Sequence, residues 1–181
     1  RMQHVAAIRK VMLDPDSPAR VHAVETLAKL GYVPTAKDKV LRALAAGETE
    51  ALHAYARWSA ANSGNAVDVR RLGELLESRQ PPLRATAAYA LRHLPPPPPE
   101  VLQKLAAAAR DAAADDEGRV YLVSAWYLHS EGSQRAEARK ILERYGKEGK
   151  THEKYEVGAV LGLAGGASDI GFLSQILNDA E

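Results

Sequence analysis

The stretch Pro18–Tyr32, PARVHAVETLAKLGY, constrains the fold more than any other part of the chain, because variants of it recur towards the C-terminus. Its apolar or small residues follow the spacing of a helix with one buried face, at Ala23, Val24, Leu27 and Leu30. Pro18 suits the first turn of a helix, and Gly31 suits the left-handed residue that ends one. The stretch therefore predicts a short amphipathic helix.

Four later stretches resemble this one, at Ala51–Gly64, Pro82–Pro95, Arg119–Gly132 and Lys154–Ala167. With the closing residues taken as Gly31, Gly64, Pro95, Gly132 and Ala167, the copies follow one another at steps of 33, 31, 37 and 35 residues. No segment alternates polar and apolar residues as a strand does. A period of this size built only of helices predicts an all-α chain folded as an α-α superhelix, or solenoid.

Each expected repeat pairs a first helix with a second helix of the Pro18–Tyr32 type. The repeats span residues 3–32, 36–64, 67–95, 98–132 and 134–167, with a partial copy at 168–181. We therefore expect a single domain over residues 1–181, made of about five and a half antiparallel helix hairpins. Because neither end has the polar capping repeat that usually finishes a solenoid, we expect the chain to be part of a longer protein.

Composition narrows the classes of partner. The formal net charge is +1, so the sequence gives no bulk electrostatic reason to expect nucleic-acid binding. No run approaches the roughly 20 apolar residues of a membrane span, and we expect no membrane insertion. The absence of cysteine excludes disulfides and thiolate metal sites, and leaves the cellular compartment open.

The pattern D-x-x-x-R-x-x-A-x-x-x-L-x-x-[LI]-G resembles the second helix of HEAT repeats, especially the short type of phycobilin-lyase-like proteins. It is carried by Asp16, Arg20, Ala23, Leu27, Leu30 and Gly31, and in part by Arg84, Ala87, Leu91 and Leu94. The resemblance implies a right-handed superhelix whose second helices line a concave surface. It also implies binding or scaffolding more often than catalysis.

Aligning the second helices gives the candidate binding residues. At the position of Glu25, on the face opposite Ala23 and Leu27, the next three copies place Trp58, Tyr89 and Trp126. Tyr55 and His93 stand at neighbouring positions of the same face. We expect an aromatic ladder in the concave groove, because exposed aromatic side chains bind apolar anchors, sugars or cations. The alternative is a register shifted by two residues, which would bury Trp58 in the core.

Three other features have structural interpretations. The run Pro95–Pro99 predicts a stiff connector, although Arg92, Leu94, Pro95 and Pro97 loosely match an SH3 ligand. Gly158, Gly162 and Gly166 stand four residues apart and predict close helix packing. No histidine pair has metal-ligand spacing, and no catalytic constellation is visible, so we expect no metal, cofactor or catalytic residue.

The sequence therefore favours a non-catalytic module that binds a partner protein, or another domain of the same polypeptide, in its groove. Two alternatives stay open. One is a HEAT-like helical enzyme of the DNA glycosylase or bilin lyase type, and the other is a structural appendage of a larger enzyme. Clustering of Arg57, Arg84 and Arg92 with the aromatic residues in one groove would favour ligand binding.

Overall fold

The structure, a computed structural model, describes residues 2–47, 50–113, 116 and 118–178. These residues form α-helices and one 3-10 helix, and they contain no strand. The helices are α1 (Met2–Leu13), α2 (Arg20–Lys29), α3 (Lys39–Ala46), α4 (Ala51–Ala61), α5 (Ala66–Leu75), α6 (Pro81–Arg92), α7 (Pro99–Asp111), α8 (Arg119–His129), α9 (Gly132–Glu148), α10 (Thr151–Ala164), η1 (Ala167–Asp169) and α11 (Ile170–Asn178). The prediction of an all-α chain is confirmed for the described residues. Residues 48 and 49 of the expected second repeat and residues 179–181 of the partial last copy lie outside them.

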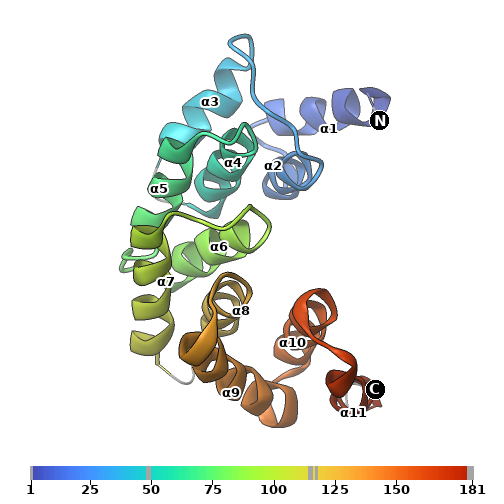
Figure 1. Ribbon diagram of the computed structural model, residues 1–181. Coiled ribbons are helices and arrows are strands. Elements are labelled where there is room, and N and C mark those ends of the chain that lie inside the picture. Colours follow the sequence, from blue (N-terminus) through green and yellow to red (C-terminus); the bar gives the residue numbers. More distant parts are fainter. Residues whose placement is uncertain (1, 48–49, 114–115, 117, 179–181) are drawn as a thin grey trace.

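The helices form an arc with an inner and an outer side (Figure 1). Each even-numbered helix from α2 to α10 packs on the odd-numbered helix that precedes it. The even-numbered helices also pack in order against one another, α2 on α4, α4 on α6, α6 on α8 and α8 on α10. These five helices therefore present one continuous inner face, with α3, α5, α7 and α9 behind them (Figure 1).

Helix α2 shows how the sequence produces these elements. Its buried residues are Ala23, Val24, Leu27 and Ala28, which form one face at helical spacing. Gly31 ends the helix with φ of +70°, the left-handed conformation that glycine adopts at little cost. Leu30 was expected on the buried face but is 38% exposed, because it lies at the C-cap, where the chain turns away from the core. Pro18 was expected in the first turn but lies before the helix, because α2 begins at Arg20 after the N-cap Ala19. The predicted helix is otherwise confirmed.

An arginine side chain ties the two helices together in each of the first four hairpins. Arg20 Nε donates to the carbonyl of Met12 at 3.0 Å, and Arg57 Nη2 donates to the carbonyl of Gly47 at 3.2 Å. The same contact recurs from Arg84 to Ser78 at 2.9 Å and from Arg119 to Ala109 at 3.0 Å. Each arginine thus places a cation and a donor at the C-terminal end of the preceding helix, where carbonyl groups lack helical partners.

The core is built largely from alanine, which lets helices approach closely. Ala54, Ala87, Ala88 and Ala125 are fully buried among the leucines of α5, α6 and α8. At Gly146 the approach of α9 to α11 is so close that a Cβ would lie 2.6 Å from the Phe172 ring. The expected close packing at Gly158 and Gly162 is wrong, because a Cβ at either position would meet open space.

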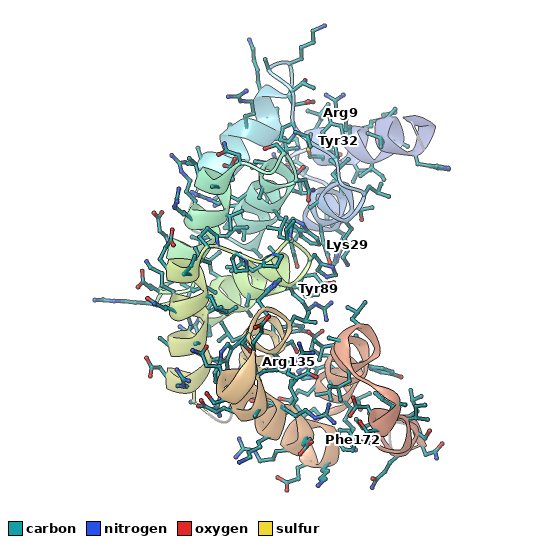
Figure 2. The ribbon with its side chains drawn as sticks, in the orientation of Figure 1. Arg9, Lys29, Tyr32, Tyr89, Arg135 and Phe172 are labelled. Carbon is teal, nitrogen blue, oxygen red and sulfur yellow. The ribbon has the colours of Figure 1, made fainter. Side chains whose placement is uncertain are left out.

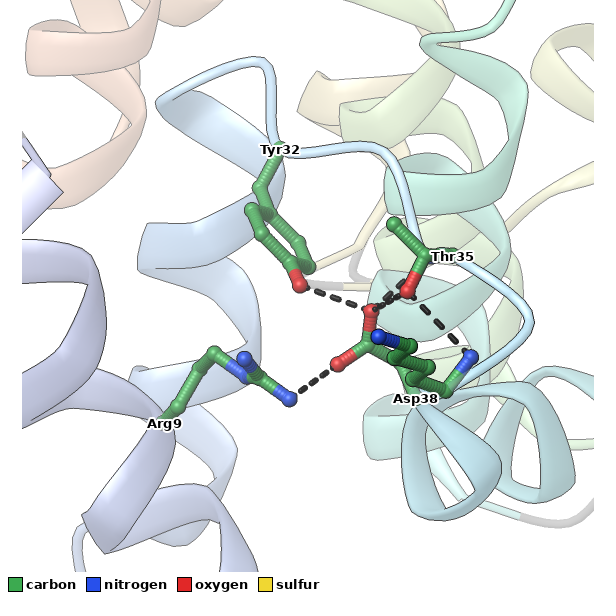
Figure 3. Close-up of polar contacts among 5 residues, drawn as sticks. Arg9, Tyr32, Thr35 and Asp38 are labelled. Carbon is green, nitrogen blue, oxygen red and sulfur yellow. Dashed lines mark hydrogen bonds and ion pairs between the residues drawn. The ribbon is translucent and has the colours of Figure 1, made fainter.

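Asp38 holds the N-terminal part of the arc together (Figure 3). Its Oδ2 accepts hydrogen bonds from the Tyr32 hydroxyl at 2.7 Å and from the backbone N–H and hydroxyl of Thr35 at 2.8 and 2.9 Å. Its Oδ1 accepts a hydrogen bond from Arg9 of α1. Burial opposes ionisation of Asp38, but these donors outweigh burial and lower the pKa of the carboxyl group.

Replacing Asp38 with asparagine is expected to lower the free energy of unfolding by about 2 kcal/mol at neutral pH, since Arg9 loses its anionic partner and one donor of the cluster is left unmatched. Because the folded-state pKa is depressed, this stabilisation is present above the unfolded-state pKa and is lost as the pH falls through the folded-state value. The difference between the variant and the wild type should therefore narrow below about pH 4. Urea unfolding at neutral and acidic pH measures this difference in the free energy of unfolding. Asp111→Asn, at an exposed position, is the control. A difference independent of pH would contradict the assignment.

Candidate functional site

The inner face of the arc is hollowed into a cleft of about 540 Å³, which we call the inner cleft. Residues of α2, α4, α6, α8 and α10 line it. The lining includes four tyrosines, Tyr55, Tyr89, Tyr121 and Tyr155, and four ionisable side chains, Glu25, Arg92, His152 and Glu156. The volume lies within the range of about 300–1,000 Å³ that is typical of ligand pockets.

Helical periodicity turns these side chains towards the cleft. In α6, Leu83, Ala87, Ala88 and Leu91 are buried in the core, which leaves Ala85, Tyr89 and Arg92 on the opposite face. In α10, His152, Glu156 and Ala159 follow the same spacing of four and three residues. The cleft is therefore the shared face of stacked helices, and not a loop structure.

A second hollow of about 540 Å³ lies on the other side of the molecule, between α7 and the segment that joins α5 to α6. Its lining consists of alanines, Leu76 and polar or charged side chains such as Glu77 and Lys104, and it contains no aromatic residue. The inner cleft therefore has the better chemistry for recognition.

Tyr89 lies on the inner side of the arc (Figure 2), where it lines the inner cleft and contacts several charged and aromatic side chains. The Lys29 ammonium lies 5.3 Å and the Arg92 guanidinium 4.9 Å from its ring centroid, both within cation–π range. Tyr121 meets Tyr89 edge to face, with 5.8 Å between the centroids. Glu25 in turn binds Lys29 at 2.6 Å. These contacts connect α2 to α6 and α6 to α8 across the cleft.

Arg92 and Glu156 form an ion pair at the wall of the cleft. Arg92 Nη1 donates to Glu156 Oε1 at 2.7 Å, and the two side chains are 6% and 7% exposed. Burial raises the pKa of Glu156 above its ordinary value, although the Arg92 charge opposes that effect. The pair links α6 to α10 past the intervening α8, and so fixes the width of the cleft.

The hydroxyls of Tyr55 and Tyr121 keep their protons at neutral pH. Burial, then the negative charge of Glu25, raises the pKa of Tyr55 well above its ordinary value. Burial, then the charge of Glu156, raises the pKa of Tyr121. These two hydroxyls are therefore neutral hydrogen-bond donors as well as acceptors.

The structure brings Tyr55 and Tyr89 into the inner cleft but not the other three residues of the expected ladder. Trp58 is 2% exposed and Trp126 is fully buried, so the expectation that both tryptophans are exposed in the groove is wrong. Trp58 packs between α4 and α6, where its ring stacks on His93 with 4.8 Å between centroids. Trp126 faces the outer helices, with Arg110 of α7 at 4.6 Å from its ring centroid.

The two tryptophans were misplaced because an error in the repeat alignment rotates a side chain about its helix axis. Each residue of misalignment turns a helical side chain by about 100°, so an error of one or two residues moves it from the cleft into the core. The fourth copy was aligned across the longest step, 37 residues, and there the position assigned to Trp126 is wrong. Of the three arginines named above, Arg92 reaches the cleft, whereas Arg57 and Arg84 bind carbonyls of preceding helices.

Sequence reasoning missed Tyr121, Tyr155 and Glu156, although one signal for the tyrosines was available. Tyr55, Tyr89, Tyr121 and Tyr155 follow one another at steps of 34, 32 and 34 residues, close to the repeat period. A regular tyrosine in successive copies was a better guide to the shared face than the irregular tryptophans.

The structure contradicts the SH3-ligand interpretation of the proline run, because two of the residues that would contact an SH3 domain are not accessible. Arg92 is held by Glu156, and Leu94 is only 6% exposed. Pro99 is the first residue of α7, where its missing N–H costs nothing, and Pro98 has φ of −54° and ψ of 150°, near polyproline II geometry. The run is a connector between α6 and α7.

His93 lies at the C-cap of α6, outside the lining of the inner cleft, with one ring face covered by Trp58. That partial burial and the neighbouring Arg92 and Lys29 cations lower the pKa of His93 to about 4. Arg92 Nη2 lies 3.1 Å from His93 Nε2, and a donor at that distance fits a neutral ring that accepts at Nε2.

An NMR titration should therefore show His93 neutral until the pH falls to about 4. Between about pH 6.5 and 4 the unfolded chain binds the proton that the folded chain excludes, so this contribution to stability is present above that window and is lost as the pH falls through it. His93→Gln should flatten the pH dependence of the urea midpoint in the same window. An ordinary histidine titration of His93 would contradict the assignment.

The described residues contain no group of three or more histidine or acidic side chains arranged to hold a metal ion. None of the described helices combines the length and the hydrophobicity needed to cross a bilayer. No protein-family model matches this sequence, and no curated protein is detectably similar to it.

Proposed function

We propose that this chain is a helical-repeat module that binds a segment of a partner polypeptide in the inner cleft. The observation that carries the proposal is the tyrosine row. Tyr55, Tyr89, Tyr121 and Tyr155 come from α4, α6, α8 and α10, one from each, and all line the same cleft. Tyrosine offers a large rigid surface and a polar tip, which makes it a frequent anchor of protein recognition.

The proposal includes an α-solenoid of HEAT-like hairpins over the whole chain. It is supported by the ordered packing of α2, α4, α6, α8 and α10 and by the arginine-to-carbonyl contact that recurs in four successive hairpins. In stacked repeats of this kind each unit contacts its neighbours, and one side forms an extended binding surface. The partner is another protein or another domain of the same polypeptide.

Binding fits the charges of the inner cleft better than acid–base catalysis does. Glu25 is paired with Lys29 and Glu156 with Arg92, so each carboxylate already has a cation of the chain itself. A general acid or base works when its proton can reach the substrate within hydrogen-bond distance. The two ion pairs instead stabilise the helices that carry the tyrosines.

The test is selection from a displayed library of random peptides, followed by measurement of the selected peptides against variants. Tyr155→Ala is suitable because the side chain is 60% exposed and its loss should not unfold the chain. We expect binding at least about tenfold weaker than to the wild type, as for a recognition hot spot. Lys104→Ala, on the outer side of the arc, is the matched control and should bind normally.

Hydrogen exchange locates the bound peptide independently of any substitution. Protection along α6, α8 and α10 supports the proposal. Selected peptides that bind Tyr155→Ala as tightly as the wild type and protect only the outer helices would overturn it, as would a library that yields no binder.

A further inference from the structure

Several hydrogen-bond donors of the inner cleft have no partner within the described part of the chain. Arg92 Nε is buried and makes no hydrogen bond, although the other two nitrogens of the guanidinium contact Glu156 and His93. The hydroxyls of Tyr121 and Tyr155 also lack a hydrogen bond to any described residue. Arg92 Nε is enclosed by the chain, whereas Tyr121 and Tyr155 line the cleft, so a ligand that brings acceptors can take up the hydrogen bonds that these two hydroxyls offer.

The strong acceptors of the cleft are, by contrast, already engaged. Glu156 Oε1 accepts from Arg92 at 2.7 Å and Glu25 Oε1 binds Lys29 at 2.6 Å. A cationic ligand would have to displace a cation that the chain holds in place, and an anionic ligand would face two carboxylates. The charges cancel in pairs, and this favours an uncharged ligand that has more acceptors than donors.

We infer that the inner cleft binds a proline-rich segment of a partner polypeptide in the polyproline II conformation, an assignment that rests on the proposed function. Proline has a carbonyl group and no N–H, so such a segment offers acceptors without donors. Polyproline II has no internal hydrogen bonds, and its carbonyls are free to accept from the hydroxyls of Tyr121 and Tyr155. Its rigid rings match grooves lined by aromatic side chains and lose little entropy on binding.

The occupant belongs to a separate segment and not to Pro95–Pro99 of a second copy. That run is tied at one end to Leu94, which is 6% exposed, and at the other to α7, which begins at Pro99. A short run anchored at both ends cannot lie along a cleft that extends over several helices.

The test is fluorescence anisotropy with a fluorescein-labelled oligoproline of about ten residues, which extends about 30 Å at 3.1 Å per residue. A glycine–serine peptide and a lysine-rich peptide of equal length carry the same label as controls. The variant is Tyr121→Phe combined with Tyr155→Phe, which keeps both rings and removes two donors. Tyr145→Phe removes a buried hydroxyl outside the cleft and is the matched control.

We expect saturable binding of the oligoproline, at least about tenfold weaker binding of the double variant, and unchanged binding of Tyr145→Phe. Equal binding of the glycine–serine peptide, tighter binding of the lysine-rich peptide, or a normal affinity of the double variant would overturn the inference. The inference would also fail if the protein dimerised, if the oligoproline inhibited that dimerisation and if Pro96→Ala abolished it. The occupant of the inner cleft would then be a second copy of the chain.

The display selection described above separates this inference from the proposed function. If selected peptides bind the inner cleft but contain no proline, and the oligoproline does not bind, the inference fails and the proposed function stands. If no peptide of either kind binds, both fail.

Discussion

Replacing Arg92 with leucine is expected to lower the free energy of unfolding by about 3–5 kcal/mol at neutral pH, because it leaves Glu156 buried without its cation. The two side chains are 6% and 7% exposed, so little water can replace the lost partner. Urea unfolding measures the loss. The matched control is Arg70→Leu. Arg70 pairs with Glu100 at 2.8 Å, but both side chains are about half exposed, so this substitution should leave the free energy of unfolding almost unchanged.

The pH dependence of the Arg92→Leu defect identifies its cause. Burial already raises the pKa of Glu156, and removal of Arg92 takes away the charge that opposes burial. A carboxyl group with a raised folded-state pKa is stabilising below its unfolded-state pKa, and that stability is lost as the pH rises through the folded-state value. The defect should therefore be smaller at about pH 5 than at about pH 7. Adding Glu156→Gln should recover part of the loss. If the loss of unfolding free energy is small, does not change with pH and is not recovered by Glu156→Gln, the Arg92–Glu156 pair is solvated and the explanation is wrong.

Local sequence was sufficient for the helices and their order, because those depend on spacing within a few residues. The buried stripe of α2 and the left-handed Gly31 are both visible in Pro18–Tyr32. The second repeat was expected to begin at residue 36, but α3 begins at Lys39, because Thr35 and Asp38 are engaged in hydrogen bonds with each other and with Tyr32. That cluster joins residues from separate elements, and no helical period reveals it.

The inner cleft was harder to predict than the helices, because it depends on the rotation of each helix relative to its neighbours. Tyr55 and Tyr89 were placed correctly on the cleft face, whereas Trp58 and Trp126 were assigned to it and are buried. The Arg92–Glu156 pair joins residues 64 positions apart through the stacking of α6, α8 and α10. Such a contact follows from packing angles that are set by the whole core.

Trp126→Ala is expected to cost about 3–5 kcal/mol, the range for removing a large aromatic ring from a core. The indole is fully buried, Arg110 covers it at 4.6 Å, and its Nε1 donates to Gln134 Oε1 at 3.4 Å. The cavity lies between α8 and the outer helices, where fixed backbones limit collapse. Since a domain is typically stable by only about 5–15 kcal/mol, the variant should unfold at a much lower urea concentration, as followed by circular dichroism.

Tyr155→Ala is the matched comparison, because its ring is 60% exposed on the inner side of the arc. It should change the unfolding free energy by no more than about 0.5 kcal/mol while weakening peptide binding. Trp126→Ala therefore tests the core, and Tyr155→Ala tests the cleft. If Trp126→Ala kept full stability but lost the peptide, Trp126 would stand in the groove, as the repeat alignment first placed it, and the assignment of the inner cleft to the tyrosines would be wrong.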